Sequence, residues 1–82
     1  MYEAQVKVTL KKTVADPQGL TIKHALESFG FSGIDGVRMG KFITLTLKSK
    51  DEAAAKDEAA KMCGKLLANP IIEDYTIEVV KV

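Results

Sequence analysis

A chain of 82 residues with 46% hydrophobic and 28% charged residues has the composition of a folded protein, and its length leaves room for a single domain over residues 1–82. Twelve Lys and Arg against eleven Asp and Glu give a net charge of +1, too small to steer the protein onto nucleic acid or an anionic membrane. No apolar run reaches the roughly 20 residues needed to cross a bilayer. Composition therefore argues against a large enzyme, a disordered chain, a nucleic-acid partner and a membrane partner.

Cysteine usage and the first residues suggest a compartment. Cys63 is the only cysteine, so the chain cannot form an internal disulfide. No arginine-rich or apolar leader precedes the first residues. We therefore expect a cytoplasmic protein.

The first half of the sequence predicts a strand, a turn and a helix. Residues 3–10 alternate between polar and apolar, which is typical of a strand with one wet face. Asp16 to Gly19, with the sequence Asp-Pro-Gln-Gly, predicts a turn. A helix is expected from Leu20 to Phe29, because apolar residues recur at helical spacing and Gly30 supplies a left-handed stop. The apolar stripe of this helix should face a core.

The second half predicts extended structure, a second helix and a final strand. Residues 34–48 make either a hairpin or one bent strand, and both alternatives stay open. Ser49 to Glu52 fits an S-x-x-E capping box, so a helix should begin there. It should end at Asn69-Pro70, because the residue before Pro is pushed out of the helical region. Residues 72–82 alternate again and predict a strand.

These elements predict an α+β fold, a two-layer sandwich related to the ferredoxin-like pattern. Its order is strand, helix, strand or hairpin, helix, strand, with three or four largely antiparallel strands and both helices on one face. Phe42, Val80 and Val82 are the apolar candidates for the other face. Uncovered apolar surface and open strand edges favour self-association. We therefore expect a homo-oligomer.

No pattern of residues predicts a catalytic, cofactor-binding or metal-binding site. His24, the only His, lies within the first predicted helix, and Cys63 lies on the apolar stripe of the second, where a small core residue is favoured over a reactive thiol. One His and one Cys cannot make a structural zinc site. Phosphate-loop and RNA-binding signatures are missing. Three acidic pairs are expected to be solvated surface: Asp51-Glu52, Asp57-Glu58 and Glu73-Asp74.

The segment from Gly36 to Lys41 comes nearest to an anion site. Two glycines flank a short stretch that carries Arg38 and Lys41. A bulged strand with exposed cations and a contact with an anionic ligand or acidic partner both fit this pattern. The two interpretations stay open.

Four separated segments occur in the order and spacing of a known family. They are DPQG at 16–19 after a basic strand, LESFGF at 26–31, VRMGK at 37–41 and CGKLLANPIIE at 63–73. Together they resemble the PurS subunits of phosphoribosylformylglycinamidine synthase, over essentially the whole chain.

The resemblance implies a small non-catalytic subunit of the fourth step of de novo purine synthesis. That multi-subunit enzyme converts phosphoribosylformylglycinamide to the amidine with ATP and with ammonia released from glutamine. In the family, the glutaminase subunit PurQ makes the ammonia, the synthetase subunit PurL uses ATP and Mg²⁺, and PurS joins them as a homodimer or homotetramer. The resemblance implies no cofactor in this chain.

Within this interpretation, three loops are expected to face the partner subunits. They carry specific polar and turn residues where sandwich packing alone requires little. The candidate contact residues are Asp16, Pro17, Gly19, Arg38, Gly40, Lys41, Asn69 and Pro70. The alternative, that the Pro and Gly residues only shape turns, stays open.

Two other functions are compatible with the same fold. A stand-alone ferredoxin-like regulatory module would bind a small ligand at an oligomer interface, and it would not co-purify with a glutaminase and a synthetase. An acylphosphatase-like hydrolase would need a glycine-rich, arginine-bearing phosphate cradle, which the first loop lacks. We therefore place the hydrolase last.

Overall fold

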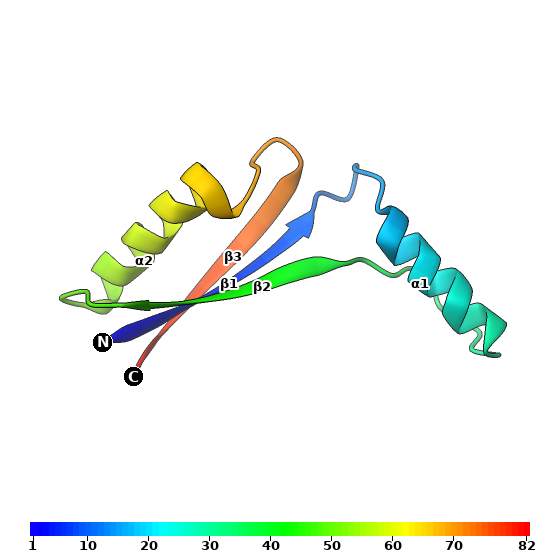
Figure 1. Ribbon diagram of the computed structural model, residues 1–82, viewed down its shortest axis with the longest axis horizontal. Helices are drawn as coiled ribbons and strands as arrows, with labels where there is room; N and C mark the ends of the chain where they lie inside the picture. The colour runs from blue at the N-terminus through cyan, green and yellow to red at the C-terminus, as the bar shows by residue number, and fades with distance from the viewer.

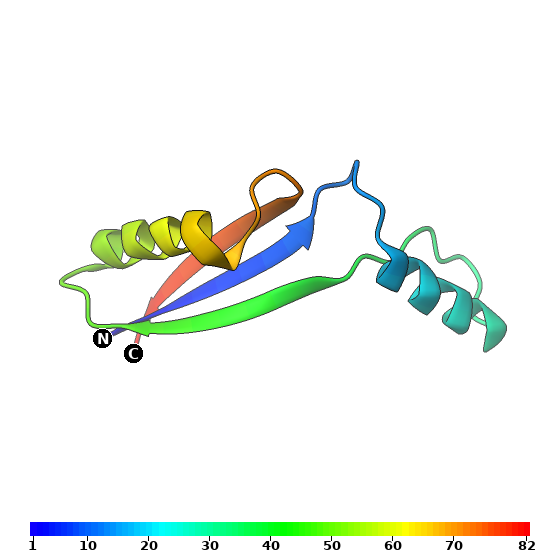
Figure 2. The same cartoon turned by 45° about the horizontal axis from the view of Figure 1, so that its top comes forward.

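The computed structural model describes all 82 residues and shows a three-stranded sheet with one helix on it and a second helix projecting from one end (Figure 1, Figure 2). The elements in chain order are β1 (Tyr2–Leu10), α1 (Pro17–Ser28), β2 (Gly40–Leu47), α2 (Glu52–Met62), the π-helical turn η1 (Cys63–Leu67) and β3 (Glu73–Lys81). The predicted α+β class and the order of elements are confirmed. The sheet has three strands, the lower of the two predicted numbers.

The central strand of the sheet is β1, which pairs antiparallel with β2 on one side and β3 on the other. Val6 is opposite Ile43 in β2 and Ile77 in β3. Because paired residues share a face of the sheet, this register assigns the even-numbered residues of β1 to one face. Ala4, Val6 and Val8 are all buried there.

Helix α2 covers this face and completes the core. It buries Ala55 and Ala59, and η1 adds Cys63, so small side chains let the helix lie close to the strands. Cys63 is a core residue, as predicted, and burial raises the pKa of its thiol. The remaining apolar side chains packed around the core are Ile43, Leu45, Leu67 and Ile77.

The N-terminus of α2 differs from the prediction. Asp51 caps the helix, since its Oδ1 accepts a hydrogen bond from the Ala54 N–H at 2.7 Å. Ser49 Oγ instead donates to Glu58 Oε2 at 3.0 Å. The predicted capping box is therefore wrong, because Asp is as good an N-cap as Ser and stands two residues closer to the helix. Asp51 is likewise a cap and not merely a solvated acid.

Helix α1 begins earlier than predicted. Asp16 is its N-cap and Pro17 its first residue, a position where the missing N–H of Pro is not needed. The turn predicted over Asp16 to Gly19 is therefore wrong, because these residues form the cap and first turn of the helix. At the other end, Gly30 has φ of 94° and stops the helix as predicted.

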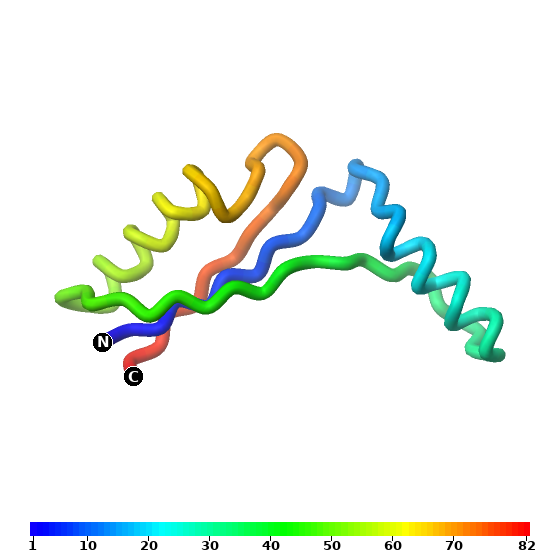
Figure 3. Tube along the Cα trace, viewed as in Figure 1, coloured from blue at the N-terminus to red at the C-terminus, as the bar shows by residue number.

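The expectation that α1 faces a core within its own chain is wrong. The helix stands away from the sheet (Figure 3), and Leu20, Phe29 and Phe31 are 54%, 80% and 60% exposed. Its connection joins β1 to β2, which are adjacent and antiparallel, so the chain has only to reverse direction. In contrast, β2 and β3 lie on opposite sides of β1, and α2 must cross the sheet to connect them.

The molecule is elongated as a result. Its principal extents are 50 × 27 × 15 Å and its radius of gyration is 16.1 Å, against about 12 Å for a compact chain of this length. The single chain therefore does not fold into a compact shape that encloses α1.

Neither α1 nor α2 is long and apolar enough to cross a bilayer.

Residues 34–48 form neither of the two predicted structures. The strand covers only Gly40–Leu47, and the preceding residues 31–39 are irregular. The opposite face of the sheet carries Phe42 and Val80, as predicted, because they pair with Lys7 and Glu3 on the polar side of β1. Val82 lies just past β3, and its N–H donates to the Met1 carbonyl.

Replacing Val6 by Ala tests the position of the core. Val6 is fully buried in the central strand, so Val6→Ala should lower the free energy of unfolding by about 2 kcal/mol. Lys7→Ala, its exposed neighbour on the open face, should change it by less than about 0.5 kcal/mol. Urea denaturation of both variants measures the difference. Equal effects would contradict the register.

Candidate functional site

The predicted partner-contact residues gather at one end of the sheet, where β1 ends and β2 and β3 begin (Figure 1). Three segments that are distant in sequence meet there: the start of α1, the start of β2 and the loop before β3. The eight residues divide among them as Asp16, Pro17 and Gly19; Arg38, Gly40 and Lys41; and Asn69 and Pro70. The structure thus brings into one region what the sequence shows as three loops.

Asp16 links the first two segments. Its Oδ1 accepts the Gly19 N–H at 2.9 Å and its Oδ2 accepts the Met39 N–H at 2.7 Å. These two bonds, and the charge of Arg38, hold the pKa of the buried Asp16 carboxyl below its usual value, although burial acts the other way. The ionised form therefore stabilises the fold above the ordinary Asp pKa of about 3.9, and this contribution is lost as pH falls through the lowered value.

Arg38 binds the loop that follows β1. Its Nη2 donates to the carbonyl oxygens of Lys11 at 2.8 Å and Val14 at 2.9 Å, and lies 3.5 Å from that of Leu10. One guanidinium group thus lies within hydrogen-bond distance of three converging backbone carbonyl oxygens. Arg38 shapes this loop in addition to any contact with a partner, which stays a prediction.

A second polar group lies where β3 begins. Lys41 Nζ is 3.7 Å from Glu73 Oε2 and 3.4 Å from the Leu67 carbonyl oxygen. Glu73 Oε1 accepts the Asn69 N–H at 2.6 Å, and the Glu73 N–H donates to the Asn69 carbonyl at 2.7 Å. The prediction of a solvated Glu73 is therefore wrong, because this half-buried side chain closes the loop. The acid four residues after Asn69 is the signal that could have revealed it.

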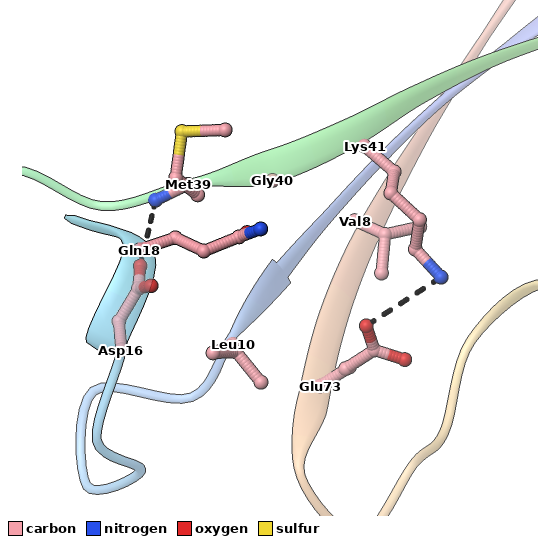
Figure 4. Close-up of a pocket in the computed structure, with 8 residues that line it drawn as sticks. All are labelled: Val8, Leu10, Asp16, Gln18, Met39, Gly40, Lys41 and Glu73. Atoms are coloured by element: carbon pink, nitrogen blue, oxygen red, sulfur yellow. Dashed lines mark hydrogen bonds and ion pairs between the residues drawn. The ribbon is translucent and has the colours of Figure 1, made fainter. Parts of the chain in front are cut away.

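A shallow cavity of about 240 Å³ lies between these two polar groups (Figure 4). It is smaller than most sites for drug-sized ligands, which range from about 300 to 1,000 Å³. The size of this one cavity therefore gives no specific support to the ligand-binding module. The lining residues are Val8, Leu10, Asp16, Gln18, Met39, Gly40, Lys41 and Glu73.

Other reactive groups lie elsewhere. His24 is exposed on α1, and Cys63 is buried under α2. No three His, Cys, Asp or Glu side chains are placed to share a metal ion. The polar groups at the end of the sheet are therefore the best-formed candidate site, and their contact with a partner stays a prediction.

Contacts within the chain explain why both candidate contact glycines, Gly19 and Gly40, lack a side chain. A side chain on Gly19 would overlap the carbonyl of Val37, so the first turn of α1 lies directly against the segment before β2. A Cβ on Gly40 would lie 2.6 Å from the Val8 carbonyl oxygen. Close packing of backbone therefore explains both residues, and their contact with a partner stays a prediction.

Comparison with known proteins identifies the family. Residues 3–81 match the family model described as PurS, phosphoribosylformylglycinamidine (FGAM) synthase. The chain belongs to the PurS family. It is therefore a subunit of FGAM synthase, a glutamine-dependent ligase of purine biosynthesis, as the sequence motifs predicted.

Relatives in the PurS family match the chain over nearly its full length. The crystal structure of PurS from Methanocaldococcus jannaschii is 44% identical and has a TM-score of 0.91, with 100% of this chain and 99% of that chain covered. The PurS subunit of Bacillus subtilis is 46% identical, with 100% and 96% covered. A chain in the structure of PurLQS from Thermotoga maritima is 28% identical, with a TM-score of 0.88 and 96% of both chains covered.

Two alanine substitutions test the close approach of α1 to the segment before β2. Gly19→Ala places a methyl group against the Val37 backbone, which cannot move aside as a side chain would, and should lower the free energy of unfolding by about 1–3 kcal/mol. Gly64→Ala enters open space within η1 and should leave stability unchanged or raise it by up to about 1 kcal/mol. Thermal unfolding measures both. A tolerated Gly19→Ala would show that the approach is looser than described.

Proposed function

We propose that this chain joins the PurL and PurQ subunits of FGAM synthase as a non-catalytic scaffold. The observation that carries the proposal is the likeness to a chain of the Thermotoga maritima PurLQS structure over 96% of both chains. ATP and Mg²⁺ are then used by PurL and not by this chain, and the complex acts in the cytoplasm. The chain contributes as one domain, residues 1–82.

The end of the sheet that gathers the candidate residues is the proposed contact with these partners. Its backbone loops are fixed by Asp16, Arg38 and Glu73, so the surface has a defined shape before it binds. Leu66 and Ile71, close in sequence to Asn69-Pro70, are 85% and 81% exposed. Exposed apolar side chains beside ordered polar loops are typical of protein interfaces.

The physical benefit of such a scaffold is containment of ammonia. Free ammonia is mostly protonated near neutral pH and is then no longer a nucleophile. A passage that excludes water between the glutaminase and synthetase sites keeps it reactive. A small subunit braced against both proteins can hold that passage closed.

The proposal includes a homodimer or homotetramer, in which a second copy of this chain covers α1. Leu20 of this helix, and Phe29 and Phe31 just after it, are exposed to solvent, and α1 makes no extensive contact with a strand of its own chain. The extended shape of the single chain supports the same conclusion. Burying these side chains between copies removes from water apolar surface that the single chain cannot cover.

Reconstitution tests the scaffold function. Purified PurL and PurQ are assayed for amidine formation with glutamine and, separately, with ammonium salt at high pH, with and without this chain. Omitting the chain should lower the glutamine-dependent rate at least ten-fold and leave the ammonia-dependent rate unchanged, because supplied ammonia needs no passage. Full glutamine-dependent activity in its absence would refute the proposal, as would turnover by the chain alone.

Substitutions at the C-terminal end of α1 and just beyond it test the oligomer. The double variant Phe29→Ser, Phe31→Ser should dissociate to monomers at concentrations where the parent protein is oligomeric, and it should stay folded because both side chains are exposed in the single chain. Phe42→Ser, on the open face of the sheet, should leave the oligomer intact. Analytical ultracentrifugation measures all three proteins. Dissociation by Phe42→Ser alone would place the interface on the sheet instead.

A further inference from the structure

Packing against the sheet does not explain the direction in which α1 projects from it. Two segments join the helix to the sheet, residues 11–16 before it and residues 29–39 after it. Neither segment is regular over its full length, and α1 makes no extensive contact with a strand or with α2. Without further contacts, a helix on two such connections would adopt many directions.

Asp16 supplies the missing restraint. Its two carboxylate oxygens bind different amides, that of Gly19 in the first turn of α1 and that of Met39 immediately before β2. One buried side chain thus ties the start of the helix to the start of a strand. The distances of 2.9 and 2.7 Å are those of strong bonds to an ionised acceptor.

Arg38 and Gly19 hold the same junction from two other sides. The Arg38 guanidinium binds the loop after β1 through the Lys11 and Val14 carbonyls. Gly19 lets the helix lie against the backbone of Val37. Both connections to α1 therefore meet at one polar junction, which we define as Asp16, Gly19, Arg38 and Met39.

We propose that Asp16 is a positioning residue that sets the direction of α1 and thereby the geometry in which its apolar side meets a second copy of the chain. The consequence for association rests on the oligomer proposed above. The role of Asp16 in setting the helix direction does not rest on that oligomer, because the direction of α1 is a property of one chain. Asp16 acts here through the Met39 amide and not through contact with the partner copy.

An ordinary N-cap would not set the direction of its helix, and Asp51, the N-cap of α2, provides a matched control within the same chain. Asp51 caps α2 by the same type of bond, to the Ala54 N–H, and its carboxylate accepts no other hydrogen bond. Replacing Asp by Asn preserves capping, since the two residues are equally good N-caps. The two amides are bound by different oxygens of Asp16, and Asn replaces one of these oxygens by an NH2 donor, so in the same position Asp16→Asn satisfies Gly19 or Met39 but not both.

The first measurement is the direction of α1 in the oligomeric protein. Spin labels are placed at Glu27→Cys on α1 and Thr46→Cys on β2, with the buried Cys63 replaced by Ala and labelled chains diluted into unlabelled ones so that only distances within a chain count. Asp16→Asn should broaden the distance distribution at least two-fold, and Asp51→Asn should leave it unchanged. Exchange of the Met39 amide hydrogen should accelerate at least ten-fold in Asp16→Asn only.

The second measurement is self-association by analytical ultracentrifugation. Asp16→Asn should raise the dissociation constant at least ten-fold while circular dichroism shows unchanged helix content, and Asp51→Asn should leave the constant unchanged. An unchanged distance distribution in Asp16→Asn would overturn the proposal. So would a broadening produced by Asp16→Ala but not by Asp16→Asn, because Asp16 would then act only as a cap.

A backbone variant covers the case in which Asp16→Asn does not fold. An 82-residue chain is accessible to chemical synthesis, and an ester in place of the Arg38–Met39 peptide bond replaces the Met39 N–H by an oxygen and leaves every side chain unchanged. This variant should also broaden the distance distribution, and an unchanged distribution would overturn the proposal. A monomeric parent protein would refute the oligomer alone, since the distance within one chain is still measured.

Discussion

The covered face of the sheet is where this chain buries its apolar side chains, and only nine of 82 residues are buried in all. Helix α2 supplies that cover and buries Ala55 and Ala59, while Val6 and Val8 of β1 pack with Cys63 and Ala68. This core is formed by one helix and one face of three strands, and α1 is not part of it. The remainder of the molecule is therefore organised by hydrogen bonds, which are directional and fix angles where apolar contact would only fix proximity.

The topology explains why the two helices differ so much. A connection between strands on either side of β1 has to cross the sheet, whereas a connection between neighbouring antiparallel strands does not. The long segment between β1 and β2 is thus free to project, and Asp16 and Arg38 gather its two ends where they leave the sheet. The same end of the sheet also receives the loop closed by Glu73. Ordered loops and a projecting helix are consequences of one strand order.

The sequence predicted those features that depend on local periodicity. Alternation in β1 correctly indicated the buried side of Val6 and Val8, and Gly30 correctly indicated the end of α1. The sequence wrongly favoured Ser49 as the cap of α2, because Ser and Asp are equally good caps and only the folded chain shows that Ser49 bonds to Glu58 while Asp51 caps the helix. The apolar stripe of α1 was also visible, but periodicity shows which side of a helix avoids water and not which molecule covers it.

In the candidate site, too, the sequence identified a residue but not its partner in the folded chain. Asp16 was selected from its turn-like sequence, yet its second bond is to Met39, 23 residues away, and only the folded chain places that amide beside it. In the proposal made above, these two bonds set the direction of α1 before any partner binds. For the scaffold function proposed above, a preset direction would lower the entropy lost on assembly. The small core and the projecting helix are therefore compatible with a scaffold whose exposed apolar side chains are covered by other chains.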